Sequence, residues 1–226
     1  MIPLSLGAGA AGVTRVLCLG AHCDDIEIGC GGTLLRWLEE RPELEVRWVV
    51  FSSDARRAAE ARASARGFLG DEPDKRLTLH QFRDGFLPYV GAEVKDAFEQ
   101  LKAEFAPDVV FTHYRHDLHQ DHRLVSELTW NTFRGPLVLE YEIPKWDGDL
   151  GNPNAYVALA EHQLRRKIEV LKDEYRTQRG RSWFEPETFR SLARLRGVEA
   201  GVPEGFAEAF YARKLVVGLA AAGSAA

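Results

Sequence analysis

The stretch AHCDDIEIGCGGTL, residues 21–34, directly follows the apolar run VLCLG of residues 16–20. An apolar run of this length predicts a buried strand, and the glycines and the pattern GGTLLRWLEE predict a helix over 31–40. The turn between them contains His22, Asp24 and Asp25. Two adjacent carboxylates beside an imidazole repel each other unless a positive charge lies between them. The composition of the turn therefore implies a cation.

Strand and helix patterns alternate along the rest of the chain. Further strands are predicted over 44–53, 76–82, 108–113 and 136–143. Further helices are predicted over 55–70, 92–105, from about 122, 162–175 and 186–197. This alternation implies βαβ units. We therefore predict an α/β fold with a Rossmann-like, mostly parallel sheet, helices on both faces, and a ligand site at the C-terminal edge of the strands.

The length, net charge and cysteine content of the chain indicate what class of protein it is. Its 226 residues suit a single α/β domain over 1–226, with ends at about 1–14 and 218–226 that we expect to be flexible. A net charge of −5 gives no electrostatic case for binding nucleic acid. No apolar run reaches the roughly 18 residues of a membrane span. The start lacks the basic region of a secretory signal and the three cysteines are odd in number, so we expect a cytoplasmic protein, with a homo-oligomer left open.

A second polar cluster, HYRHDLHQDH at residues 113–122, follows the predicted strand 108–113. It contains Asp117, Asp121 and four of the seven histidines: His113, His116, His119 and His122. Because the carboxyl ends of parallel strands meet at one edge of the sheet, this cluster and the turn at 21–25 can converge. Imidazole and carboxylate groups together suit zinc, for which three protein ligands and one open position form a catalytic site. A bound metal would be the missing positive charge.

Each cluster also has a simpler interpretation. Asp24 or Asp25 could cap the following helix, with His22 an ordinary surface residue. His119 and His122 could lie on one solvated helix face. The first turn also has some likeness to the glycine-rich loop of nucleotide or S-adenosylmethionine folds. However, G-x-G-x-x-G is absent, and two carboxylates do not suit a phosphate-binding turn.

The two motifs together resemble those of the PIG-L/LmbE-like deacetylases, zinc enzymes that remove the acetyl group from N-acetylglucosamine-type sugars. The family pattern is Ala-His-Pro-Asp-Asp before a Gly-Gly helix start, with a later His-x-Asp-His. AHCDD and HQDH correspond to these motifs, and RAAEA (57–61) and FRDGFL (82–87) match further family positions. One departure is Cys23, where the family has proline. We expect its thiol to be packed rather than to bind the metal.

The resemblance implies a role for eight residues. The implied metal ligands are His22, Asp25 and His122. Asp24 would be the general base, and His119, supported by Asp121, would be the acid and oxyanion partner. Residues lining the sugar site would be Arg57 and Asp84. One Zn²⁺ per chain is implied, with iron, cobalt or manganese as alternatives. The small-molecule substrate would be an N-acetyl amino sugar, either free or attached to inositol, a nucleotide, a lipid or an oligosaccharide.

Two other functions are kept as alternatives. A cofactor-binding enzyme such as a methyltransferase would rest only on the first turn, and stoichiometric zinc would count against it. A non-catalytic metal-binding module would require Asp24 to be dispensable. The resemblance weakens beyond Glu142, where substrate choice would be made. There the Gly/Pro/Asn-rich stretch PKWDGDLGNPN (144–154) predicts a lid or substrate loop.

Overall fold

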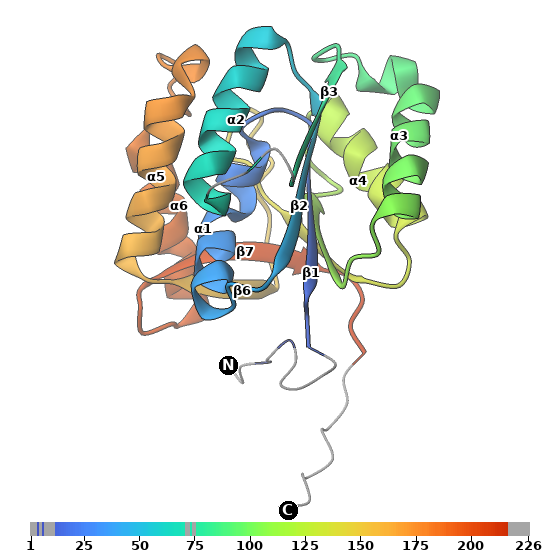
Figure 1. Cartoon of the computed structure of the whole chain (residues 1–226). Helices are drawn as coiled ribbons and strands as arrows, with labels where there is room; N and C mark the ends of the chain where they lie inside the picture. The colour runs from blue at the N-terminus through green and yellow to red at the C-terminus, as the bar shows by residue number, and fades with distance from the viewer. Residues whose placement is uncertain (1–3, 5, 7–11, 71–72, 74–75, 217–226) are drawn as a thin grey trace, which may run out of the picture.

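A computed structural model of the chain describes residues 4, 6, 12–70, 73 and 76–216 (Figure 1). The predicted flexible ends lie mostly outside this range: all of 218–226, and all of 1–14 except 4, 6 and 12–14. The strands are β1 Arg15–Gly20, β2 Glu45–Ser52, β3 Leu77–Phe82, β4 Val109–His113, β5 Leu137–Tyr141, β6 Ala155–Leu159 and β7 Phe206–Ala212. The α-helices are α1 Asp25–Glu40, α2 Ala55–Leu69, α3 Gly91–Glu104, α4 Gln120–Thr132, α5 Glu161–Glu174 and α6 Pro186–Ala200. Two short 3₁₀ turns are Leu87–Val90 and Arg176–Gln178.

The seven strands form one sheet in the order β3-β2-β1-β4-β5-β7-β6. Strands β1 to β5 pair in parallel, whereas β7 is antiparallel to both β5 and β6. The predicted mostly parallel α/β fold is therefore confirmed. Strands β6 and β7 were not predicted, and β6 in particular is mostly half-buried and directly follows a loop.

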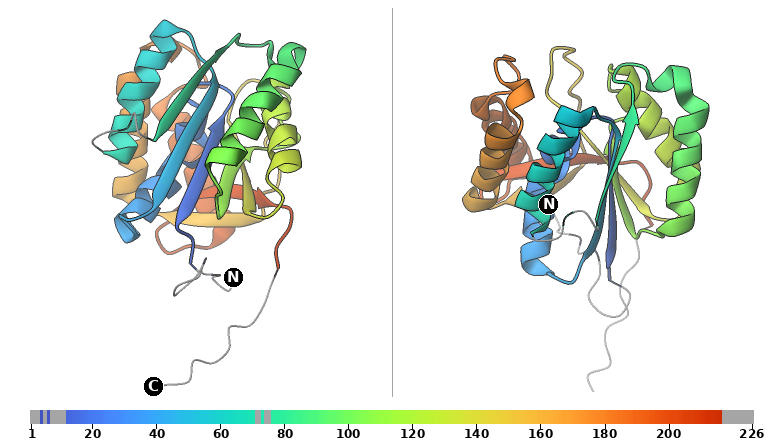
Figure 2. Two further views of the ribbon diagram at one scale, coloured as in Figure 1. Left: turned by 45° about the vertical axis from the view of Figure 1, so that its right-hand side comes forward. Right: turned by 45° about the horizontal axis from the view of Figure 1, so that its top comes forward.

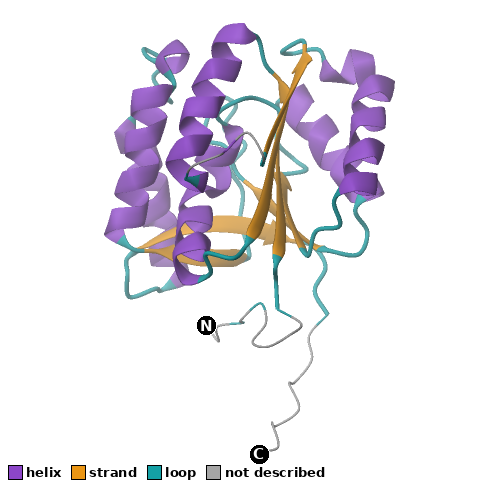
Figure 3. Cartoon of the chain, in the orientation of Figure 1, coloured by secondary structure: helices purple, strands orange, loops and turns teal. Residues whose placement is uncertain are grey.

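Helices cover both faces of the sheet, as the views in Figures 2 and 3 show. Helices α1, α2, α5 and α6 lie on one face, and α3 and α4 lie on the other. Successive side chains of β1 point to opposite faces of the sheet. Val16 and Cys18 pack into the apolar core on one face, and Leu17 and Leu19 pack into the core on the other. Because both faces are covered, the strand is apolar at every position from Val16 to Leu19, as is usual for parallel sheets.

Helix α1 begins six residues earlier than predicted, at Asp25. Its glycines are therefore inside the helix, where they permit close packing. A Cβ atom at Gly29 would lie 2.3 Å from Cδ2 of Tyr141, and one at Gly32 would lie 2.6 Å from Cδ1 of Leu159. These glycines do not form a phosphate-binding loop, which was the basis of the methyltransferase alternative.

A buried ion pair contacts the backbone in the middle of α1. The carboxylate of Glu208 accepts hydrogen bonds from the amides of Gly32 and Thr33, at 2.8 and 2.7 Å. Lys167 Nζ donates to the carbonyl of Ile28 at 2.6 Å and pairs with Glu208 at 2.7 Å. In a regular α-helix the Gly32 amide and the Ile28 carbonyl would bond to each other. The pair thus ties α1 to α5 and β7.

The sheet has its topological switch point at β1, which lies between β2 and β4. In open α/β sheets, ligands bind outside the carboxyl ends of the strands at such a point. The polar clusters at 21–25 and 113–122 follow these two neighbouring strands, β1 and β4. In the described part of the chain, no helix is long and apolar enough to cross a membrane.

Candidate metal centre and active site

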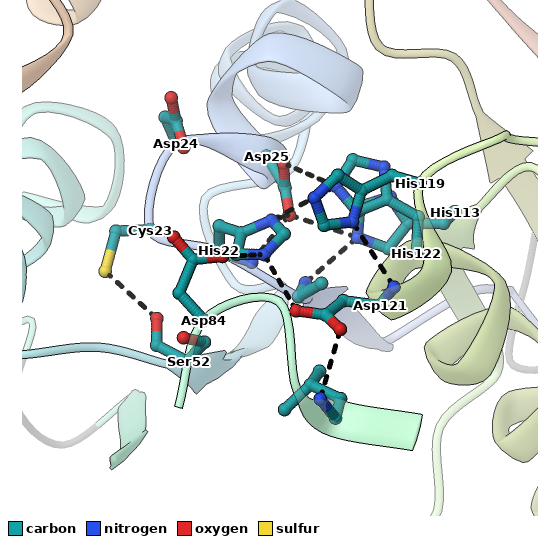
Figure 4. A network of polar contacts seen from close by, with 12 residues as sticks. His22, Cys23, Asp24, Asp25, Ser52, Asp84, His113, His119, Asp121 and His122 are labelled. Carbon is teal, nitrogen blue, oxygen red and sulfur yellow. Dashed lines mark hydrogen bonds and ion pairs between the residues drawn. The ribbon is translucent and has the colours of Figure 1, made fainter. Parts of the chain in front are cut away.

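The loops after β1 and β4 bring three predicted ligands together (Figure 4). His22 Nδ1 lies 3.1 Å from His122 Nε2 and 3.4 Å from Asp25 Oδ2, and His122 Nε2 lies 3.5 Å from Asp25 Oδ1. Ligand atoms at the usual zinc distances and tetrahedral angles are about 3.3–3.6 Å apart. The three side chains therefore lie close enough together to hold one divalent ion, with a different carboxylate oxygen of Asp25 facing each histidine.

Charge balance also favours a cation at this position. Four carboxylates are at most 4% exposed: Asp24, Asp25, Asp117 and Asp121. Arg57 pairs with Asp24 at 2.6 Å, and Lys145 pairs with Asp117 at 2.9 Å. Asp25 and Asp121 have no Lys or Arg partner among the described residues. Burying an uncompensated carboxylate is unfavourable. With neutral histidines, a divalent cation would balance these two charges.

The pKa values of the trio follow from burial and from mutual attraction. Burial, together with the charge of His113, lowers the pKa of His122 to about 4. Its imidazole is therefore neutral at neutral pH, which is the form that binds a metal. Burial disfavours the ionised form of Asp25, but the charges of His122, His113 and His22 hold its pKa well below the usual value. Burial likewise opposes the charged form of His22, but Asp25 raises its pKa well above the usual value.

Carboxylates hold the outer ring nitrogens of both histidines. His122 Nδ1 lies 2.9 Å from Asp117 Oδ2. His22 Nε2 lies 3.2 Å from Asp121 Oδ2 and 3.1 Å from Asp84 Oδ1. Such contacts orient imidazole ligands and select the nitrogen that faces the metal. They leave His22 Nδ1 and His122 Nε2 facing each other and Asp25.

The side chain of Asp121 contacts His22 rather than His119, which we predicted it would support. Its oxygens accept hydrogen bonds from the amides of Gly85 and Leu87, at 2.7 and 3.1 Å. The link to His119 runs through the backbone, because the amide of Asp121 donates to His119 Nδ1 at 3.3 Å. Burial and the charge of His22 lower the pKa of His119, and the carboxylates, including Asp121, only partly oppose them.

Asp24 lies at the N-cap position of α1, but its side chain makes no capping hydrogen bond. Instead, its Oδ1 accepts a hydrogen bond from Arg57 Nη2. The carboxylate lies apart from the cluster of histidines in Figure 4. Arg57, predicted to bind substrate, also donates to Thr177 Oγ1 at 3.0 Å and lies 5.5 Å from the ring centroid of Tyr175. The structure thus shows Arg57 as the partner of Asp24.

Cys23 and Asp84 flank the trio in different ways. The Cys23 side chain is fully buried, and its thiol donates to the carbonyl of Ser52 at 3.6 Å, away from the histidines (Figure 4). Burial raises the pKa of this thiol to about 12. The prediction that Cys23 is packed is therefore confirmed. The side chain of Asp84 is 79% exposed while it contacts His22, so it lies at the open side of the site.

Sequence reasoning gave no role to three residues around the trio. Nε2 of His113 accepts the amide of Ala21 at 2.9 Å and lies 3.1 Å from Asp25 Oδ2. Asp117 lies five residues before its partner His122, a spacing that could have identified it. Lys145, in the predicted loop 144–154, pairs with Asp117 from 28 residues away, and no local pattern indicates that contact.

Comparisons with known proteins identify the family and the fold. Residues 17–133 match the family model described as PIG-L: GlcNAc-PI de-N-acetylase. A conserved protein from Thermus thermophilus superposes with a TM-score of 0.73 at 21% identity, over 92% of this chain and 97% of its own. The N,N'-diacetylchitobiose deacetylase from Pyrococcus horikoshii, complexed with its inhibitor MPG, superposes with a TM-score of 0.63 at 22% identity. The match covers 88% of this chain and 83% of that chain.

The same fold also carries other chemistry. The 4-carboxy-2-hydroxymuconate hydratase from Pseudomonas putida superposes with a TM-score of 0.67 at 16% identity, over 92% of this chain and all of its own. At these identities the structural likeness establishes the fold alone. The activity must be argued from the site.

Proposed function

The chain belongs to the PIG-L family, whose model spans more than half of it, and we propose that it is a metal-dependent N-deacetylase. The substrate would be an N-acetylated amino sugar or a conjugate of one. The observation that carries the proposal is the spacing of His22 Nδ1, Asp25 and His122 Nε2, which matches the ligand spacing of a tetrahedral metal site.

His22, Asp25 and His122 would hold one divalent ion. Zinc is the first choice, because two imidazoles and one carboxylate suit it, with a fourth position left open. When bound, the ion supplies a Lewis acid for the amide carbonyl and lowers the pKa of water at the open position. The outer carboxylates Asp117 and Asp121 would keep the imidazoles in the ligating orientation.

Asp24 would accept the proton of the attacking water. Its Oδ1 is held by Arg57, whereas its Oδ2 has no hydrogen bond to any described residue. The pairing fixes the carboxylate and leaves one oxygen for the water. After attack, the protonated carboxyl can return its proton to the departing amine, so Asp24 would serve as base and then as acid.

His119 would donate a hydrogen bond to the oxyanion that develops on the acetyl group. Because its Nδ1 accepts the amide of Asp121, the neutral ring carries its proton on Nε2. Burial lowers the pKa of His119, so the neutral ring is favoured at neutral pH. This revises the expected role of His119 from an acid to a neutral hydrogen-bond donor. Such a donor needs no counter-charge.

Arg57 and Asp84 would line the sugar site. Asp84 is largely exposed beside His22, where a carboxylate can accept hydrogen bonds from sugar hydroxyls. Arg57 would act through Asp24 as well as on the substrate. We therefore expect Arg57→Ala to lower turnover while the metal content stays unchanged.

Acetate release from a panel of N-acetylated amino sugars and conjugates tests the proposal. We expect release by the zinc-loaded protein and a loss of at least ~10² in turnover for Asp24→Asn, with metal retained. Asp173→Asn, the same change at an exposed position on α5, should have native activity. Ordinary turnover of Asp24→Asn would contradict the mechanism, and no release from any member of the panel would contradict the function.

A further inference from the structure

A groove of about 640 Å³ runs beside α4, outside the metal centre. We call it the α4 groove. The residues that line it include Arg115, Ser126, Trp130, Arg134, Arg213 and Lys214. Arg115 follows β4, Ser126 and Trp130 lie on α4, and Arg213 and Lys214 follow β7. Ligand sites for small molecules have volumes of roughly 300–1,000 Å³. The groove is therefore large enough for a sugar phosphate or a nucleotide.

The groove is positively charged in a protein of net charge −5. Arg115, Arg134 and Lys214 form no ion pair among the described residues. Glu127 is the one acidic residue that lines the groove. Like charges gathered without partners repel one another, so the groove is favourable for an anion.

One buried carboxylate holds the floor of the groove in place. Glu140 is fully buried and pairs with Arg213 at 2.7 Å. It also accepts hydrogen bonds from Trp130 Nε1 at 2.6 Å and from the amide of Arg115 at 3.0 Å. The guanidinium of Arg213 lies 3.6 Å from the ring centroid of Trp130. The side chains of Trp130 and Arg213 and the backbone of Arg115 are thus held in place before any ligand binds.

Two buried polar atoms of lining residues lack partners. Ser126 is fully buried, and its Oγ makes no hydrogen bond. Arg213 Nε is also buried without a hydrogen bond. A buried donor without an acceptor is destabilising by about 1–3 kcal/mol. Such atoms in a native site call for an acceptor, and an anion with several oxygens would supply it.

We propose that the α4 groove binds a phosphate-bearing small molecule. A phosphate group offers several acceptor oxygens and up to about two negative charges, whereas a carboxylate offers two oxygens and one charge. Guanidinium groups match phosphate geometry through paired N–H donors. Three unpaired cations and two orphaned polar atoms therefore fit the phosphate better. The proposal does not depend on the deacetylase activity.

Binding of glucose 1-phosphate, measured by calorimetry, tests the site, with glucose as the phosphate-free control. We expect saturable binding of the phosphate ester alone. Arg115→Gln and Arg134→Gln should each weaken it about tenfold or more, since one charge-assisted hydrogen bond contributes that much. Lys172→Gln removes an exposed positive charge on α5 and should leave the affinity unchanged.

Two further variants distinguish binding in the groove from binding at the metal centre. Ser126→Ala should weaken binding several-fold without loss of stability, because it removes a buried hydroxyl that has no partner. His122→Ala should leave binding unchanged if the phosphate does not occupy the metal centre. Equal affinity for glucose, native affinity in both arginine variants, or loss of binding in His122→Ala would each overturn the proposal.

The phosphate could belong to the substrate or to a separate molecule. Arg115 lies four residues before His119, so the groove and the metal centre both use the segment that follows β4. If the phosphate is part of the substrate, Arg134→Gln should raise KM for N-acetylglucosamine 1-phosphate but not for N-acetylglucosamine. If the phosphate belongs to a separate ligand, the variant should have the same KM ratio for the two sugars as the native protein. Inactivity toward both sugars would count against the proposed function, whereas the binding measurement would still decide the groove.

Discussion

Helix α1 contacts two groups of buried carboxylates, which are neutralised in different ways. Behind its middle turn, Glu208 pairs with Lys167 at 2.7 Å, and nearby Glu142 pairs with Arg196 at 2.7 Å. At its first turn, Asp25 is surrounded by histidines alone. Glu208 and Glu142 each have their own Lys or Arg, whereas Asp25 has neither among the described residues. The difference indicates that the partner of Asp25 comes from outside the chain.

Glu27 shows a third way to bury a carboxyl group. It is fully buried on the first turn of α1, and burial raises its pKa to about 8. Its Oε1 accepts hydrogen bonds from Ser64 and Tyr175, whereas Oε2 has no partner. A proton neutralises Glu27, a lysine neutralises Glu208, and a metal would neutralise Asp25. Each solution predicts a different response to mutation.

The largest effect on stability should come from Lys167→Met. Removing one partner of a buried ion pair leaves Glu208 uncompensated and is destabilising by about 3–5 kcal/mol. Urea unfolding measures the loss. Lys172→Met, on the exposed side of the same helix, should change stability by less than about 0.5 kcal/mol. A native free energy of unfolding for Lys167→Met would show that the pair is not structural.

His119→Ala should affect catalysis without affecting the metal. Loss of an oxyanion donor lowers turnover by roughly 10²–10³. His119 also lies within reach of His22 and His122 as a possible ligand group, so metal content must be measured in the same samples. If His119→Ala loses the metal, His119 is a ligand and its proposed role is wrong.

Glu27→Gln should change the pH dependence of stability. The folded pKa of about 8 lies above the ordinary value of 4.5, so the folded state binds more protons between them. Stability is therefore full below about pH 4.5 and is lost as the pH rises toward 8. Glutamine mimics the protonated form, so the variant should gain about 3 kcal/mol at pH 7 and nothing at pH 4. Glu45→Gln, at an exposed position, should show no such gain at pH 7. If the free energy of unfolding of Glu27→Gln changed with pH in the same way as that of the native protein, the account would be wrong.

Local patterns predicted the mostly parallel sheet and the two polar clusters, and the family resemblance of these clusters implied the trio. The apolar run at β1 and the motifs AHCDD and HQDH each lie within one strand and its following turn. The parallel sheet then brings the two turns together, since β1 and β4 are neighbours. The parallel part of the sheet therefore follows from the alternation of strands and helices, whereas the antiparallel strands β7 and β6 do not.

Contacts between distant residues could not be predicted in this way. Lys167 and Glu208 are 41 residues apart. The residues next to each of them in the sequence do not indicate that the two form a buried ion pair. The glycines of α1 were assigned to a helix start, although packing against Tyr141 and Leu159 explains them. The hydrogen bonds of Asp121 were assigned to His119, because the sequence does not show that the turn at 85–87 reaches that carboxylate. These three errors concern contacts between residues that are distant in the chain.

Metal content tests most directly whether the missing partner of Asp25 is a divalent cation. The native protein, Asp25→Asn and the exposed control Asp173→Asn would be equilibrated with Zn²⁺, dialysed and analysed for metal per chain. We predict about one zinc per chain in the native protein and in Asp173→Asn, and loss of that zinc in Asp25→Asn. Full retention of zinc in Asp25→Asn, or none in the native protein, would contradict the account.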